Sequence, residues 1–216
     1  MTDQTLLCFG DSNTHGSCAI RQAGDLVRFD RNIRWPGVMA ADLGTGFHVI
    51  EEGHPGRTTL HNDPIEGPHK NGIAMLPALL ETHRPLDLVI VMLGTNDLKQ
   101  RYSLPACDIA AGVDRLLRMI VSSNSGLVGQ PPKALLVAPT PILETGFLAD
   151  MFAGGAAKSA EFSERFAYVA QAHNVSFVDA GALIEVDPVD GIHLDAAAHH
   201  TFGRAMANAV RATLAA

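Results

Sequence analysis

The 216-residue sequence lacks the features that mark membrane-spanning and nucleic-acid-binding proteins. No apolar run is much longer than a strand, so none is long enough to cross a bilayer. The chain carries 16 Lys and Arg against 23 Asp and Glu, a net charge of −7, and it has no block of one sign. Nucleic-acid surfaces cluster Lys and Arg, and anionic membranes attract polybasic segments. We therefore expect neither a nucleic acid nor a membrane as a partner.

Cysteine is also scarce. Cys8, Cys18 and Cys107 make an odd number and do not have the spacing of metal ligands. The first ten residues show neither the charged segment nor the cleavage site of a secretory signal, and their apolar residues belong to the first predicted strand. These features predict reduced thiols and a cytoplasmic protein.

Metal-binding motifs are missing too, although the chain has ten histidines. His54, His61 and His69 share a loop without a tight ligand pattern such as HExxH. The adjacent His199 and His200 would point in different directions from a helix. We expect neither a metal nor another cofactor.

What the sequence does have is a regular alternation of short apolar runs and helical patterns. Such runs are typical of buried parallel strands, whereas apolar residues three and four apart predict helices. We predict strands at 6–9, 47–51, 88–93, 134–138 and 175–178, and helices at 34–43, 73–83, 109–121, 156–173 and 195–214. The alternation predicts a flavodoxin-like three-layer α/β/α fold with a five-stranded parallel sheet, in the order 2-1-3-4-5, as a single domain over residues 1–216.

Polar residues follow the first strand at Gly10-Asp11-Ser12-Asn13. Ligands of open α/β sheets bind just outside the carboxyl ends of the strands, so Ser12 lies where a nucleophile would lie. Taken alone, the same residues are equally typical of a turn and a helix N-cap. We interpret Asp11 as structural, bonding this turn or the loop of Asn96.

Three other strand ends supply the remaining groups that acyl transfer requires. His193 is a suitable general base for Ser12, and Asp190, three residues earlier, reaches its other ring nitrogen if the segment turns once. The backbone N–H groups of Ser12 and Gly56 and the side chain of Asn96 would bind the oxyanion. Gly53 is a rival to Gly56, but we expect it to make the turn off the second strand.

Four blocks, GDSN at 10–13, the glycine loop at 52–57, GTND at 94–97 and DGIH at 190–193, together resemble the SGNH (GDSL-type) hydrolases. The resemblance covers essentially the whole chain and implies Ser12, Gly56, Asn96 and His193 as the four name-giving residues, with Asp190 completing the triad. Further stretches resemble the subgroup of bacterial arylesterases, acetyl-ester hydrolases and an acyltransferase, several of them oligomeric. Asn13 departs from the family, which commonly has Leu there.

The resemblance also implies a substrate pocket. We expect Asn13, Trp35, Thr95 and Ile192 to line it, Ile192 beside the triad. The long loops at 13–33 and 142–155 would shape the entrance. The second loop carries an apolar cluster, for which we predict a subunit contact in a homo-oligomer: Phe147, Met151 and Phe152.

The predicted function is hydrolysis of short-chain acyl (acetyl, aryl) esters through an acyl-enzyme on Ser12, with a small-molecule ester as substrate and acyl transfer as a related activity. Deacetylation of carbohydrates at the same site is an alternative, because the loop at 52–72 is polar. From another class, a non-catalytic flavodoxin-like module would bind phosphate at 10–16, but no GxGxxG or GKS/GKT is present and Asp11 would repel an anion.

Overall fold

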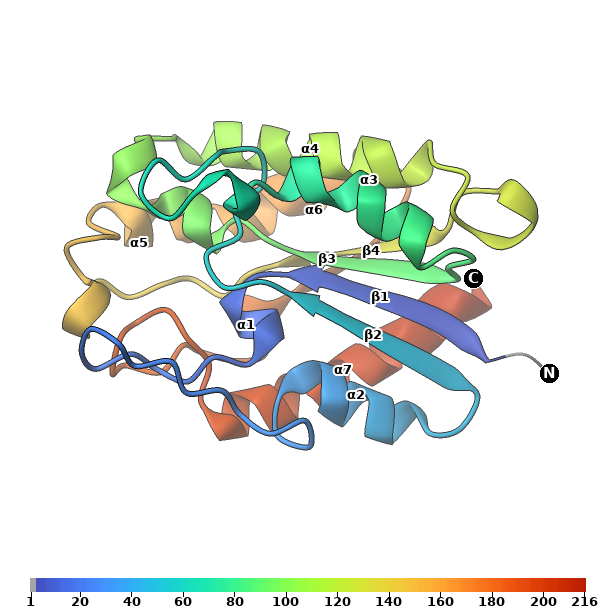
Figure 1. The fold of residues 1–216 in the computed structure, drawn as a ribbon, viewed down its shortest axis with the longest axis horizontal. Helices are drawn as coiled ribbons and strands as arrows, with labels where there is room; N and C mark the ends of the chain where they lie inside the picture. The colour runs from blue at the N-terminus through green and yellow to red at the C-terminus, as the bar shows by residue number, and fades with distance from the viewer. Residues whose placement is uncertain (1–2) are drawn as a thin grey trace.

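A computed structural model describes residues 3–216. Its five strands form one parallel sheet in the order β2-β1-β3-β4-β5, which confirms the predicted order (Figure 1). The strands are β1 (Gln4–Gly10), β2 (Phe47–Gly53), β3 (Leu88–Met92), β4 (Lys133–Ala138) and β5 (Ser176–Asp179).

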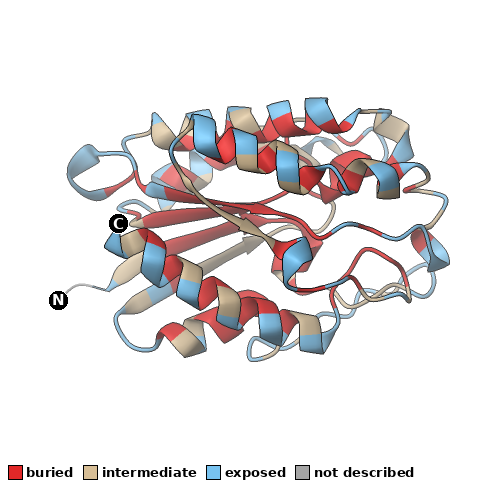
Figure 2. Ribbon diagram, turned by 180° about the vertical axis from the view of Figure 1, so that it is seen from behind, coloured by how far each residue is buried: buried red, intermediate tan, exposed pale blue. Residues whose placement is uncertain are grey.

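Helices cover both faces of the sheet (Figures 1 and 2). The side chains of each strand alternate between the two faces. Leu7 and Phe9 of β1 share one buried cluster with α3 (Gly72–Thr82), α4 (Ala106–Val121) and α6 (Phe162–Ala172). Leu6 and Cys8 share the other with α2 (Trp35–Leu43) and α7 (Ala196–Ala215). Because both faces are buried, the strands are apolar at nearly every position, as the sequence pattern predicted.

The helices follow from their sequence patterns. In α4, apolar residues recur at helical spacing, so Ile109, Val113 and Ile120 face the sheet while Asp114 and Arg118 pair on the outside. α7 begins after Asp195, whose carboxylate accepts a hydrogen bond from the N–H of Ala198 at 2.7 Å.

Two helices differ from the predicted elements. Residues 12–15, predicted as loop, form a short helix α1 (Ser12–His15) capped by Asp11 and closed by Gly16 at φ +85°. The helix predicted at 156–173 is divided into α5 (Gly155–Ser159) and α6. Ser159 explains the division, because its Oγ accepts a hydrogen bond from the N–H of Ile142 at 3.0 Å and fixes the end of α5 against the segment after β4.

Six short 3₁₀ helices complete the connections: η1 (Pro68–Lys70), η2 (Thr95–Leu98), η3 (Gln100–Tyr102), η4 (Leu127–Gly129), η5 (Gly146–Leu148) and η6 (Ala180–Ala182). Within 3–216, no helix is both long and apolar enough to cross a membrane.

The strand register brings the candidate residues to one edge of the sheet. Gly10, the last residue of β1, pairs with Gly53 of β2 on one side and with Met92 of β3 on the other, so these three neighbouring strands end level. This edge lies beside α1 in Figure 1, opposite the beginning of β1 and the end of α7. Residues that follow β1, β2 and β3 therefore meet there although they are far apart in the sequence.

Candidate active site

Ser12 is the first residue of α1, directly after the end of β1. Its backbone N–H has no acceptor within the helix, because the first N–H groups of a helix have no intrahelical partner. Asp11 holds the turn, since its Oδ1 accepts a hydrogen bond from the N–H of Asn13 at 3.0 Å. The residues thus form the N-cap and the start of a helix, and this geometry also presents Ser12 and its amide at the edge of the sheet.

Asp190 and His193 form a buried, hydrogen-bonded pair. The Nδ1 atom of His193 lies 2.5 Å from Oδ2 of Asp190, and Oδ1 of Asp190 accepts the backbone N–H groups of Ile192 and His193, each at 3.0 Å. The single turn needed for the Asp-x-x-His contact is therefore present. Oδ2 also accepts the N–H of Ile20 at 2.7 Å, a contact that the sequence did not predict.

Opposing effects determine the pKa of the Asp190 carboxyl. Burial acts to raise the pKa of its carboxyl, but the hydrogen bond from His193, the charge of that imidazole and the backbone donors outweigh burial and lower the pKa to about 2. The carboxylate therefore stays ionised at neutral pH. It fixes Nδ1 of His193 as the protonated nitrogen and leaves Nε2 as the basic one.

Asn96 and Gly56 come from the loops after β3 and β2. Asn96 lies in η2, and its Nδ2 donates a hydrogen bond to Oδ2 of Asp11 at 3.4 Å, which orients the amide. Gly56 has φ +81°, and a Cβ there would lie 2.6 Å from Oε2 of Glu66, so a larger residue would be strained. Gly53 ends β2, where a Cβ would lie 2.1 Å from the backbone N of His15. It is needed for close packing against α1.

Two buried carboxyls lie beneath this region. Burial raises the pKa of Asp11 to about 6, against hydrogen bonding from Asn13 and the charges of His193 and Arg57. Burial likewise raises the pKa of Asp97 to about 7, although Thr59 donates to it through its N–H at 2.9 Å and its hydroxyl at 2.6 Å. Burial therefore limits the negative charge that these carboxyls place next to the loop of Asn96.

Arg57 joins the ends of the first two strands. Its buried guanidinium donates hydrogen bonds from Nη1 to the carbonyl oxygens of Gly10 (2.8 Å) and Glu52, and it stacks over the ring of Phe9 at 4.3 Å. Gly10 is two residues before Ser12, and Arg57 follows Gly56 directly. The arginine thus ties the segment that leads to Ser12 to the loop that carries Gly56.

One cavity of about 360 Å³ collects the predicted residues. Ser12, Gly56, Asn96, Ile192 and His193 all line it. Its volume is within the range of small-molecule sites. The residues that the sequence analysis assigned to four separate strand ends therefore face a single space.

The rest of the cavity has two chemically different walls. One is apolar and comes from the two long loops, with Ile20, Leu26, Val27, Leu148, Met151 and Phe152. The other is charged: Lys99 is almost fully buried and lies 2.6 Å from Glu66, and Lys70 lies 3.7 Å from the same carboxylate. Sequence analysis missed the charged wall. Of the three charged residues, only Lys99 could have been connected with the site from the sequence, because it lies three residues after Asn96.

Three of the residues predicted for the substrate pocket do not line it. Trp35 is fully buried between α2 and α7, because α2 directs the indole of Trp35 towards α7. The indole packs edge-to-face against the ring of Phe202. Thr95 and Asn13 face a separate space of about 10 Å³, too small for a substrate. In this structure all three residues lie outside the cavity that Ser12 and His193 line.

The apolar cluster of the second long loop is only partly exposed. Phe152 is buried and lines the cavity, Met151 is half-buried, and Phe147 is exposed. The loop contributes the cavity wall as well as an apolar surface beside it.

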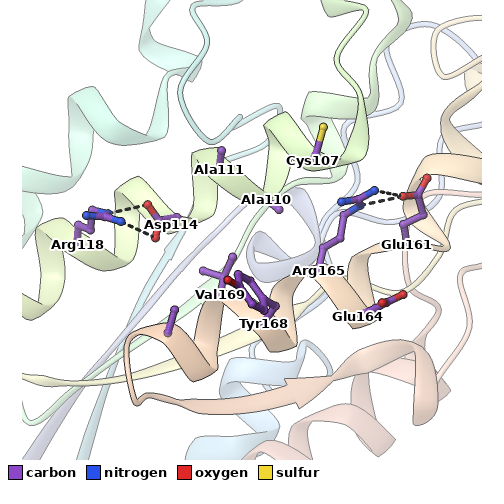
Figure 3. Close-up of a pocket in the computed structure, with 11 residues that line it drawn as sticks. Cys107, Ala110, Ala111, Asp114, Arg118, Glu161, Glu164, Arg165, Tyr168 and Val169 are labelled. Atoms are coloured by element: carbon purple, nitrogen blue, oxygen red, sulfur yellow. Dashed lines mark hydrogen bonds and ion pairs between the residues drawn. The ribbon is translucent and has the colours of Figure 1, made fainter.

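A larger cavity, of about 500 Å³, lies between α4 and α6 on the outside of the helical layer (Figure 3). Four of its charged side chains form two ion pairs between residues four positions apart in the sequence. Asp114 pairs with Arg118 at 2.7 Å, and Glu161 pairs with Arg165 at 2.5 Å. It contains Cys107 but no histidine. The smaller cavity is the candidate active site because it alone, of the two, combines a hydroxyl, an imidazole and oxyanion donors.

Among residues 3–216 no group of three or more His, Cys, Asp or Glu side chains is arranged to hold a metal ion.

A parallel α/β sheet with Ser, Gly, Asn and His gathered at its strand ends defines a class of hydrolases. Residues 8–201 match the GDSL-like lipase/acylhydrolase family, and the chain belongs to that family. It is accordingly an ester hydrolase. No curated protein sequence matches the chain.

Solved structures agree with this assignment over the full length. The aryl esterase of M. smegmatis is 40% identical, with a TM-score of 0.92 over 97% of this chain and 99% of the other, and it has also been solved with an inhibitor bound. Est24, a carbohydrate acetylesterase from Sinorhizobium meliloti, is 40% identical with a TM-score of 0.91 over the same shares. A carbohydrate acetylesterase family member from Sinorhizobium meliloti is 36% identical, with a TM-score of 0.90 over 99% of this chain and 100% of the other.

Proposed function

We propose that the protein hydrolyses small acyl esters, acetyl and aryl esters above all, through an acyl-enzyme on Ser12. The observation that carries the proposal is that Ser12, His193, Asn96 and Gly56 line one cavity while Asp190 hydrogen-bonds the far side of the imidazole. Similarity to an aryl esterase and to carbohydrate acetylesterases supports the substrate class.

Acylation begins when the Ser12 hydroxyl attacks the ester carbonyl. His193 accepts the hydroxyl proton at Nε2, because Nδ1 is held by Asp190. The oxyanion that forms accepts hydrogen bonds from the N–H groups of Ser12 and Gly56 and from the amide of Asn96. Collapse of the tetrahedral intermediate breaks the bond to the alcohol oxygen, which takes the proton from His193 and leaves as the alcohol.

Deacylation reverses these roles with water. His193 takes a proton from water as the water attacks the acyl-enzyme, and it returns that proton to Ser12 Oγ when the acid departs. An alcohol that enters instead of water would take the acyl group, so acyl transfer is the same step with another nucleophile.

The test is the rate of hydrolysis of p-nitrophenyl esters from acetate to octanoate. We expect kcat/KM to be highest for the short acyl groups, because the cavity has a volume of only about 360 Å³ and the buried Phe152 forms part of its wall. Rates that rise steadily to octanoate, or no hydrolysis by the folded protein, would contradict the proposal.

The charged wall favours a second candidate with the same chemistry, deacetylation of carbohydrates. Glu66, Lys70 and Lys99 place a carboxylate and two ammonium groups in the cavity, and these groups hydrogen-bond hydroxyls. An acetylated monosaccharide, assayed beside p-nitrophenyl acetate, separates the two candidates. A higher kcat/KM on the sugar acetate favours the deacetylase, and a higher value on the aryl ester favours the arylesterase.

We further propose that the protein forms homo-oligomers and works in the cytoplasm, where its three free thiols would stay reduced. Leu26 and Val27, which line the cavity, and Phe147, the chain neighbour of the lining residue Leu148, expose 92%, 65% and 52% of their surface. Apolar side chains gathered on one surface mark interaction sites. Light scattering at micromolar concentration should give a mass that is a multiple of 22.9 kDa. A monomer under these conditions would remove the oligomer from the proposal.

A further inference from the structure

Asn13 makes two buried hydrogen bonds across the active site. Its Nδ2 donates to the carbonyl oxygen of Ile192 at 3.0 Å, and its Oδ1 accepts the N–H of Leu194 at 3.1 Å. Only one orientation of the amide satisfies both bonds, so the side chain has no freedom to flip. The side chain is 5% exposed and does not line the catalytic cavity.

The positions of these bonds in the sequence give them their meaning. Asn13 is the chain neighbour of Ser12, and Ile192 and Leu194 are the two chain neighbours of His193. The two segments are about 180 residues apart in the sequence and belong to different elements. One side chain therefore connects the backbone that carries the hydroxyl to the backbone on both sides of the imidazole.

The other contacts of His193 do not supply this connection. Asp190 fixes the imidazole through Nδ1 and through the backbone N–H of His193, but Asp190 belongs to the same loop. Asp190 also accepts the N–H of Ile20 at 2.7 Å, but Ile20 lies eight residues after Ser12, in the long loop that follows α1. That bond holds the long loop and not α1 itself. Asn13 joins the loop of Asp190 and His193 directly to α1.

We propose that Asn13 is a positioning residue that sets the placement of Ser12 relative to His193. The inference rests on the proposed roles of these two residues. Proton transfer between a hydroxyl and an imidazole requires hydrogen-bonding distance, and a misplacement of about 1 Å lowers the rate by roughly 100-fold. A residue that acts in this way affects the chemical step and not the fit of the substrate.

The experiment compares the wild type with Asn13→Leu, which keeps a similar shape and loses both bonds. Leu is the common residue of the family at this position, so the variant asks whether this chain depends on the two bonds that its own Asn13 makes. For p-nitrophenyl acetate we expect kcat to fall by roughly 10- to 100-fold while KM stays within about twofold. The rate of labelling of Ser12 by a fluorophosphonate should fall in parallel. An unchanged kcat, or a loss confined to KM, would overturn the inference.

Thr140→Val is the matched control. The Thr140 hydroxyl donates a similarly buried, long-range hydrogen bond to the carbonyl oxygen of Ile184 at 3.0 Å and does not line the catalytic cavity. We expect it to lower the melting temperature as Asn13→Leu does, yet to leave kcat unchanged. Equal losses of kcat in both variants would show a general effect of lost stability and would overturn the inference.

A second variant covers the case in which Asn13→Leu does not fold. Asn13→Asp keeps an oxygen for the N–H of Leu194 and loses only the donor to Ile192. On the alkaline plateau of its pH profile we expect a lower kcat at unchanged KM, and a wild-type kcat would contradict the inference. Ser12→Ala, assayed in parallel, distinguishes a failure of the proposed function from a failure of the inference about Asn13. If Ser12→Ala keeps its activity, the proposed function fails and the inference with it; if Ser12→Ala is inactive and Asn13→Asp is fully active, only the inference fails.

Discussion

Replacement of Ser12 by Ala should lower kcat for p-nitrophenyl acetate by at least about 10⁴-fold, the range typical of a lost nucleophile. The hydroxyl is the only protein group in the proposed mechanism that bonds to the acyl carbon, so no neighbouring residue can replace it. Ala is a good helix former, and Ser12 begins α1, so the variant should fold and melt as the wild type does. Steady-state kinetics and a thermal melt check both parts.

Ser17→Ala is the control for this experiment. Ser17 also lines the cavity, where its Oγ lies 3.2 Å from Nδ1 of His15, so it too is a serine next to a histidine. We expect Ser17→Ala to keep most of the activity. A fluorophosphonate should label Ser12 and leave Ser17 unmodified, as read by mass spectrometry of the peptides. Activity that survives Ser12→Ala and disappears with Ser17→Ala would reassign the nucleophile.

Asp190→Asn should lower kcat by about 10⁴-fold, as expected when a triad carboxylate can no longer select the imidazole tautomer. Both oxygens of Asp190 accept N–H groups: Oδ1 accepts two backbone donors, and Oδ2 accepts Nδ1 of His193 and the N–H of Ile20. An amide NH₂ in either place faces a donor. The imidazole then loses the acceptor that keeps its proton on Nδ1, and Nε2 is no longer the basic nitrogen.

The pH dependence of stability gives an independent check on Asp190. Because the folded state holds the pKa near 2, below the ordinary carboxyl value, the ionised carboxylate stabilises the fold above about pH 4. That contribution is lost as the pH falls towards 2. The difference in melting temperature between wild type and Asp190→Asn should therefore be constant near neutral pH and shrink in acid.

Asp187→Asn is the matched control, because Asp187 lies in the same loop and its Oδ1 accepts the N–H of Val189 at 2.9 Å. An asparagine oxygen can keep that bond, so we expect both activity and its pH profile to stay close to wild type. If the two variants lose activity equally, the loop as a whole and not the Asp190–His193 contact would be responsible.

Much of the fold could be predicted because the sheet is buried on both faces. Strands of this kind are nearly continuous apolar runs, and the 88–93 run therefore identified β3 within one residue. The helix at 12–15 could not be found in this way, since four residues are too few for a periodic pattern. The break between α5 and α6 is accompanied by a hydrogen bond that the Ser159 hydroxyl accepts from the distant backbone N–H of Ile142, which no local pattern contains.

The candidate site, like the fold, could be predicted where its signals are local in the sequence and not where they depend on distant contacts. Ser12, Asn96 and His193 follow strand or loop signals that are local in the sequence, and the register of the sheet brings them together. The walls of the cavity are set by contacts between loops, such as that of Glu66 with Lys99, over large sequence separations. Trp35 was misplaced for a related reason: its position at the start of α2 is clear from the sequence, but the direction of its side chain depends on the packing of α2 against α7.

The hydrogen bond from the N–H of Ile20 to Asp190 links the choice of substrate to the chemistry. Ile20 belongs to the loop that forms part of the apolar wall, and three arginines of the same stretch hold that loop to Glu51: Arg28, Arg31 and Arg34. We expect a substrate that is too bulky for the cavity to displace this wall, which would move the N–H of Ile20 away from the Asp190 carboxylate. The enzyme would thus discriminate against large esters in turnover as well as in binding. The wall that contacts the substrate also donates a hydrogen bond to Asp190, the carboxylate that orients His193.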